Sequence, residues 1–149
     1  MKMLIFYFSF LPIFIFSQNI DHWETVVYDN DIWNYFEGTA EPDSNWRLLS
    51  YNDSNWLQGQ GGIGYGDGDD STVINNVTSL YLRKNFVIVD SSAISSAVLH
   101  VDYDDAFVAY LNNVEIAREN IGNIGDHPLF NQGSSSLHEA QMYQGGTPD

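Results

Sequence analysis

The sequence predicts an all-β protein, built as an antiparallel β-sandwich or jelly roll. Short stretches alternate apolar with polar residues, turn-forming residues separate them, and no stretch long enough for an amphipathic helix appears. Short strands joined by long polar loops are typical of sandwiches and jelly rolls. The chain has no Cys, so we expect burial, and bound metal if any is present, to stabilise the fold instead of disulfides.

Residues 1–17 have the pattern of a signal peptide. Lys2 supplies the positive charge, and an almost unbroken apolar run follows over residues 3–16. A membrane-spanning helix needs about 20 apolar residues, which makes this run short for an anchor. We expect cleavage after Ser17, secretion to the extracellular space or cell surface, and a mature domain of residues 18–149 without a membrane span. An uncleaved anchor is the alternative.

The chain is strongly acidic, with 20 Asp and Glu against 5 Lys and Arg and a net charge of −15. Such a surface repels phosphate backbones and anionic lipid, so nucleic acid is not an expected partner. It suits cations and neutral ligands such as a glycan or polysaccharide. Plain solubility outside the cell would explain the same charge.

Seven stretches have strand-like patterns: 24–29, 31–36, 46–50, 79–89, 97–103, 107–111 and 114–117. Residues 52–56 resemble a capped turn, in which a side-chain oxygen accepts a backbone N–H. The longest strand signal is 79–89. Asn112 and Asn113 tolerate the positive φ of a tight turn, so they predict a hairpin between 107–111 and 114–117.

Residues 58–70 predict a glycine-rich loop that carries a cluster of acids. Glycines at 64, 66 and 68 permit backbone shapes that other residues avoid. Neighbouring carboxylates repel one another unless solvent or a cation separates them. Calcium takes 6–8 oxygen ligands, so two acidic clusters are candidate metal sites. Their members are Asp67, Asp69 and Asp70 in this loop and Asp104 and Asp105 before the hairpin. A solvated acidic loop is the alternative for the first cluster, and Asp residues that cap the turn at the approach to the hairpin are the alternative for the second.

Aromatic residues are the candidate ligand contacts, because their faces suit the apolar faces of sugar rings. We predict ligand-binding roles for Trp33, Trp56 and Tyr65, although most large aromatics are expected to pack in the core. Arg83 lies within a strand signal in a chain rich in acids. We expect it to pair with Asp102 or Asp104.

Nothing in the pattern indicates catalysis. The four His are scattered without zinc-ligand spacing, and the glycine-rich stretch lacks the Lys-Ser/Thr of a P-loop. We therefore expect no enzymatic activity in this chain and leave the activity of the full-length protein open.

Several motifs occur in a recognisable order over residues 23–148. They are Trp33-Asn-Tyr35, Trp46, Asp53-Ser-Asn-Trp56, the run 62–70, Ser79-Leu-Tyr-Leu-Arg83 with Phe86, and the stretch 102–118. This order resembles the galactose-binding-like jelly-roll module of secreted multidomain bacterial proteins, found N-terminal to spore-coat-H-type kinase, lamin-tail-like or metallophosphoesterase domains. The signal sequence is similar to those of Bacteroidota.

The resemblance implies a secreted, non-catalytic, carbohydrate-binding-like module that serves downstream domains of the same polypeptide. Family members continue into a further strand, so we expect this module to be truncated at its C-terminus. The pair Asp104-Asp105 also resembles the paired Asp of calcium-dependent sugar-binding domains of the protective-antigen and flocculin type, in which calcium contacts sugar hydroxyls. Two alternatives stay open: a structural or adhesive spacer without its own ligand, and the N-terminal fragment of a secreted enzyme.

Overall fold

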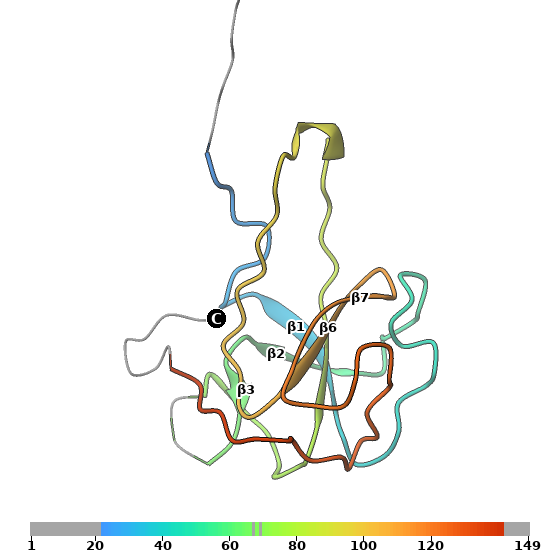
Figure 1. Cartoon of the computed structure of the whole chain (residues 1–149), viewed down its shortest axis with the longest axis vertical. Coiled ribbons are helices and arrows are strands. Elements are labelled where there is room, and N and C mark those ends of the chain that lie inside the picture. The colour runs from blue at the N-terminus through green and yellow to red at the C-terminus, as the bar shows by residue number, and fades with distance from the viewer. Residues whose placement is uncertain (1–21, 67, 69, 142–149) are drawn as a thin grey trace, which may run out of the picture.

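The computed structural model describes residues 22–66, 68 and 70–141, and this part of the chain is mostly strand and loop (Figure 1). The elements are β1 (Ile32–Glu37), β2 (Leu57–Gln60), β3 (Ile63–Gly64), β4 (Thr72–Val73), β5 (Leu80–Arg83), the 3-10 helix η1 (Ser91–Ala93), β6 (Phe107–Leu111) and β7 (Val114–Glu119). The all-β prediction is confirmed at this level. No helix among the described residues is long and apolar enough to cross a membrane.

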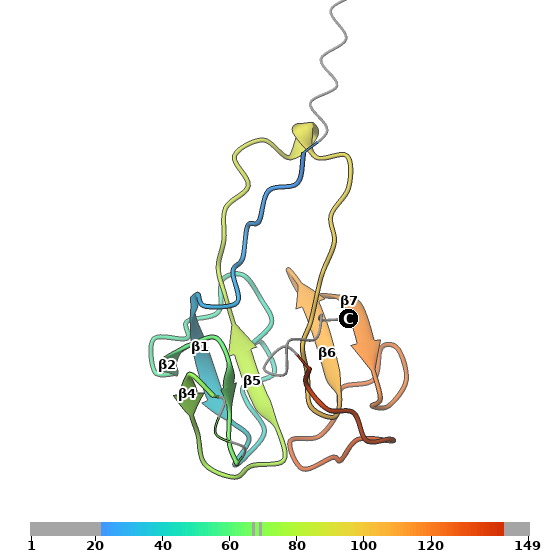
Figure 2. The ribbon, with the colours of Figure 1, turned by 90° about the vertical axis from the view of Figure 1, so that its left-hand side faces the viewer.

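The strands form three small sheets. β2, β1 and β5 make an antiparallel sheet in that order, β6 and β7 make an antiparallel hairpin, and β3 pairs with β4 in parallel. Figure 2 shows the three-stranded sheet and the hairpin as two separate layers. The antiparallel part of the prediction is therefore confirmed for the two larger sheets.

Aromatic side chains fill the space between the two layers. Trp46, from the loop after β1, makes edge contacts with Tyr81 on β5 and Tyr110 on β6, with ring centroids 5.4 and 6.0 Å apart. Its ring also lies 6.1 Å from that of Trp56. These contacts join the loop, the sheet and the hairpin in one aromatic cluster. Among the described residues, Tyr35 and Tyr103 are the only buried apolar side chains, at 8% and 9% exposure, so the core is thin.

The β6–β7 hairpin has the predicted turn. Asn112 and Asn113 have φ angles of 49° and 71°, and Leu111 pairs with Val114 across the turn. A turn with positive φ at both central residues matches the twist of the strands beside it, which explains the choice of Asn. The hairpin prediction is confirmed, with β7 two residues longer than expected.

Two predicted strands are absent, and local polar contacts explain the absence of one of them. Residues 46–50 form turns, because Asp43 Oδ1 accepts the Asn45 N–H at 2.8 Å and its carbonyl oxygen accepts the Trp46 N–H at 2.9 Å. Such side-chain to backbone bonds compete with strand pairing. Residues 24–29 also lie outside any sheet. The turn at 52–56 is confirmed, since Asn52 Oδ1 accepts the Ser54 N–H at 3.1 Å.

The glycine-rich stretch is partly strand. The prediction of one loop over 58–70 is wrong at two places. β2 covers the start of this stretch, and β3 lies inside it. Glycine is compatible with β2 because Gly59 faces Thr72, where an added Cβ would come within 3.1 Å of the Thr72 Cβ. The sharply turned part is confirmed at Gly66 and Gly68, whose φ angles are 109° and 89°.

The two longest strand predictions are only partly right. Of residues 79–89, only Leu80–Arg83 pairs in a sheet, and residues 97–103 pair with no strand among the described residues. Instead, residues 84–90 and 94–103 run as two extended segments away from the body of the molecule and meet at η1 (Figures 1 and 2). We call these two segments the arms.

Candidate functional site

A shallow depression of about 240 Å³ lies where β1 meets the start of β2. Trp56 ends the turn at 52–56 and directly precedes β2. The pairing of Tyr35 with Leu57 places this end of β2 beside β1. The lining combines aromatic and polar side chains: Tyr35, Phe36, Glu37, Thr39, Asn55, Trp56 and Leu57. An aromatic wall with a few converging polar groups is the usual make-up of a small-molecule site.

Neighbouring residues hold the lining in place. The Trp56 ring packs against those of Phe36 and Tyr51, with centroids 5.7 and 5.9 Å apart. The Glu37 carboxylate accepts the Asn75 side-chain amide at 2.7 Å and the Asn75 backbone N–H at 3.4 Å. The depression therefore presents a ring and a carboxylate whose orientations are set without a ligand.

The structure does not bring the three predicted aromatic ligands together. Trp56 lines the depression, but Trp33 does not: it pairs with Gly59, two residues along β1 from the Tyr35–Leu57 pair that borders the depression. Tyr65 lies in the glycine-rich loop at 41% exposure, and its hydroxyl donates to the Val77 carbonyl at 3.3 Å. The prediction of a sugar contact therefore concerns Trp56 in this depression, while Trp33 and Tyr65 lie elsewhere.

The polar part of the lining has almost no recognisable signal in the sequence. Glu37, Thr39 and Asn55 are single polar residues without a spacing pattern. Asn55 adjoins Trp56 in the capped turn, and that adjacency is the only local signal that could have found it.

Only one member of the first acidic cluster is described. Asp67 and Asp69 lie outside the described residues. Asp70 packs its carboxylate against Gly64, at a place where any Cβ on residue 64 would collide with it. Glycine at this position thus allows the close approach of the acid to the chain.

The second acidic cluster lines a depression of about 420 Å³. Asp104 and Asp105 meet Leu137, His138 and Glu139 there. Asp105 Oδ1 accepts the His138 backbone N–H at 2.8 Å, and the His138 ring stacks on Tyr103 at 4.0 Å. Asp105 therefore has a structural role, because it fixes the segment that contains His138.

The described side chains do not assemble a complete metal site. No group of three or more His, Cys, Asp or Glu within the described part of the chain is arranged to hold an ion. Calcium also accepts carbonyl and water oxygens, so two carboxylates can form part of its shell. Calcium binding at Asp104 and Asp105 stays a prediction.

Arg83 pairs with Asp53, and the prediction of Asp102 or Asp104 is wrong. Arg83 Nε donates to Asp53 Oδ2 at 2.8 Å, and Nη1 donates to the carbonyls of Trp46 and Leu48. Burial acts to raise the pKa of Asp53. Hydrogen bonds from Arg83 and Asn34 outweigh it, so the pKa lies below its ordinary value. This pair ties β5 to the turn that carries Trp56, and so it positions the depression.

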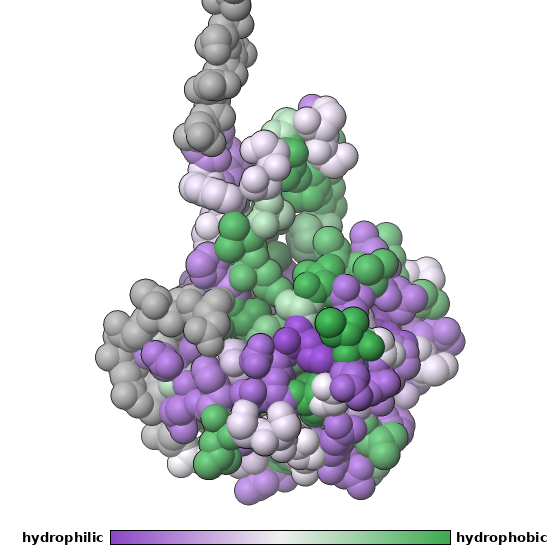
Figure 3. All heavy atoms as spheres, in the orientation of Figure 1, coloured by the Kyte–Doolittle hydropathy of each residue, from purple (hydrophilic) through white to green (hydrophobic). Residues whose placement is uncertain are grey.

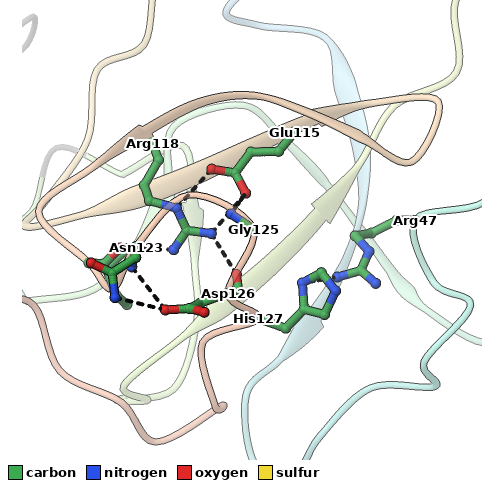
Figure 4. Close-up of polar contacts among 8 residues, drawn as sticks. Arg47, Glu115, Arg118, Asn123, Gly125, Asp126 and His127 are labelled. Atoms are coloured by element: carbon green, nitrogen blue, oxygen red, sulfur yellow. Dashed lines mark hydrogen bonds and ion pairs between the residues drawn. The ribbon is translucent and has the colours of Figure 1, made fainter.

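A second buried arginine organises the far end of the hairpin (Figure 4). Arg118 on β7 makes a two-point ion pair with Glu115, at 2.8 and 3.0 Å, and donates to the carbonyls of Ile121 and Asp126. Nearby, Arg47 donates to His127 Nδ1 at 2.8 Å. These contacts hold the loop after β7 against the hairpin, which is a structural role.

Comparisons with protein-family models, with curated proteins and with solved structures each find no match to this chain.

Proposed function

We propose that this protein is a secreted, non-catalytic carbohydrate-binding module, with a galactose-binding-like jelly-roll architecture, that serves a larger extracellular protein. The observation that carries the proposal is the depression beside Trp56, whose lining also includes Glu37 and Asn55. Such polar groups can bind sugar hydroxyls while the ring contacts an apolar sugar face. Its volume is below the roughly 300–1,000 Å³ of drug-sized sites, which suits a single sugar ring.

A glycan array tests this proposal with matched asparagine variants. We expect the wild-type chain to retain at least one glycan, and Asn55→Ala to weaken that binding by about tenfold, the effect of losing roughly 1.4 kcal/mol. Asn131→Ala is the control, because Asn131 is exposed and lines neither depression. Absence of any retained glycan, or equal losses in the two variants, would contradict the assignment.

A bound cation would strengthen the same proposal. We propose that calcium binds at Asp104 and Asp105, or at Asp67, Asp69 and Asp70, and that millimolar calcium therefore raises the melting temperature. A ligand that binds only the folded state at a hundredfold excess over Kd stabilises it by about 2.7 kcal/mol.

Two double substitutions separate the candidate calcium sites. Asp104→Asn with Asp105→Asn, or Asp69→Asn with Asp70→Asn, should abolish the calcium-dependent shift if the site lies there. If a pair only suffers mutual repulsion, its substitution should instead raise the melting temperature without calcium. Identical melting curves of the wild type in calcium and in chelator would show that neither cluster binds calcium.

A structural or adhesive spacer is the second candidate. It is favoured by the exposed apolar arms, which have no role in a sugar site beside Trp56. The glycan array distinguishes the two, because a spacer retains no glycan.

A further inference from the structure

The arms expose an apolar surface that the body of the molecule does not cover. Side chains on the outer parts of both arms are exposed, with Val87 at 82%, Val89 at 98% and Val98 at 59%, whereas Tyr103 at the base of the second arm is buried at 9%. Figure 3 shows hydrophobic colouring over much of this projection. Single exposed apolar residues are normal on proteins, but a contiguous set on one projection indicates an interaction surface.

The backbone of the outer parts of the arms, residues 85–89 and 95–101, is unpaired as well. No hydrogen bond reaches the main chain of residues 85–89 or 95–101 within the described structure. Both segments are extended and carry the β-branched residues typical of strands, as the sequence analysis expected. An extended segment with free N–H and C=O groups is a template on which another strand can pair. The missing partner of the arms is therefore a β-strand.

The net charge of the chain indicates what charge the partner strand has. Residues 85–101 contain a single acid, Asp90, and neither Lys nor Arg, whereas the whole chain has a net charge of −15. A second copy would bring another −15 to the contact, and the two bodies would repel. A neutral or basic strand gains the same backbone pairing and apolar contact without that repulsion.

We propose that the arms are a docking site for a β-strand supplied by a partner polypeptide, with apolar residues at alternate positions and Lys or Arg at its ends. The strand pairs its backbone with an arm and covers the exposed valines. This role is separate from the sugar site, because the depression beside Trp56 includes no arm residue.

A capped peptide that alternates valine with threonine, with lysine at both ends, is a direct probe. Fluorescence anisotropy with the full chain should report saturable binding, and hydrogen exchange should show new protection in residues 85–89 or 95–101. The same peptide with N-methylated backbone amides should not bind, because it lacks the donors that strand pairing needs. Val87→Ser with Val98→Ser should weaken binding about tenfold or more, since it removes apolar contact.

Val73→Ser is the matched control, because Val73 is 73% exposed but lies on β4, away from the arms. It should leave peptide affinity unchanged. Circular dichroism should be the same for all variants, because every substituted valine is exposed. Three results would each overturn the proposal: no peptide binding, equal binding of the N-methylated peptide, or a dimer in light scattering that dissociates in the Val87/Val98 variant. The last would make a second copy the occupant.

Discussion

Replacing Arg83 with methionine is expected to lower the free energy of unfolding by about 3–5 kcal/mol. Arg83 is only 9% exposed, and its guanidinium is the hydrogen-bond donor to the Asp53 carboxylate and to two backbone carbonyls. Methionine keeps apolar volume but leaves these acceptors without their donor. Urea denaturation monitored by tryptophan fluorescence measures the change, because Trp46 and Trp56 lie beside the affected turn.

Lys84→Met is the matched control for this substitution. Lys84 also pairs with an acid, at 3.3 Å from Asp31, but their side chains are 22% and 29% exposed. Solvent screens such a pair, so its loss should have a much smaller effect. Arg83→Lys should fall between the two, because lysine keeps the charge and loses the fixed fork of donors. If Arg83→Met and Lys84→Met lower the free energy of unfolding equally, the buried Arg83 pair contributes no more to stability than the exposed Lys84 pair.

Local signals account for the parts of the fold that the sequence predicted well. The Asn112-Asn113 turn is specified by residues adjacent in the chain, as is the capped turn that leads to Trp56. Alternation of apolar and polar residues predicts the strand at 80–83. Its neighbour β1 was expected almost to the residue.

Long-range choices account for the errors. Asp53 reaches Arg83 from a turn 30 residues earlier, and no local pattern distinguishes it from the other acids. Whether an alternating segment finds a partner strand is also a tertiary matter, so the pattern of residues 85–89 and 95–101 predicts extended chain but not the absence of a partner strand. The candidate site divides in the same way: Trp56 follows a recognisable turn, whereas Glu37 reaches it only through strand pairing.

The Glu115–Arg118 pair is expected to make stability fall at acid pH. The pKa of Glu115 is lowered from 4.5 to about 2, mainly by the hydrogen bonds from Arg118. The Gly125 N–H and the positive charge of Arg118 lower the pKa further, whereas burial acts to raise it. A carboxyl whose pKa is lower in the folded state stabilises the fold fully above its unfolded pKa. That stabilisation should therefore be lost as pH falls from about 4.5 to about 2.

Glu115→Gln should remove this part of the acid dependence, and Glu119→Gln is the control on the same strand. Glu119 is exposed, so its substitution should leave the pH profile almost unchanged. Thermal melts at intervals between pH 2 and pH 7 measure the profiles.

Arg118→Met should act more strongly than either glutamine variant. It removes the two arginine donors of the Glu115 carboxylate, which is 13% exposed, and leaves it only the Gly125 N–H. It also removes the donors to the Ile121 and Asp126 carbonyls. The pKa of Glu115 should rise in this variant, because burial then acts without the opposing guanidinium. We therefore expect a lower melting temperature at neutral pH and an acid transition that begins at higher pH. An Arg118→Met variant that melts like the wild type at pH 7 would show that the loop after β7 is held by other contacts.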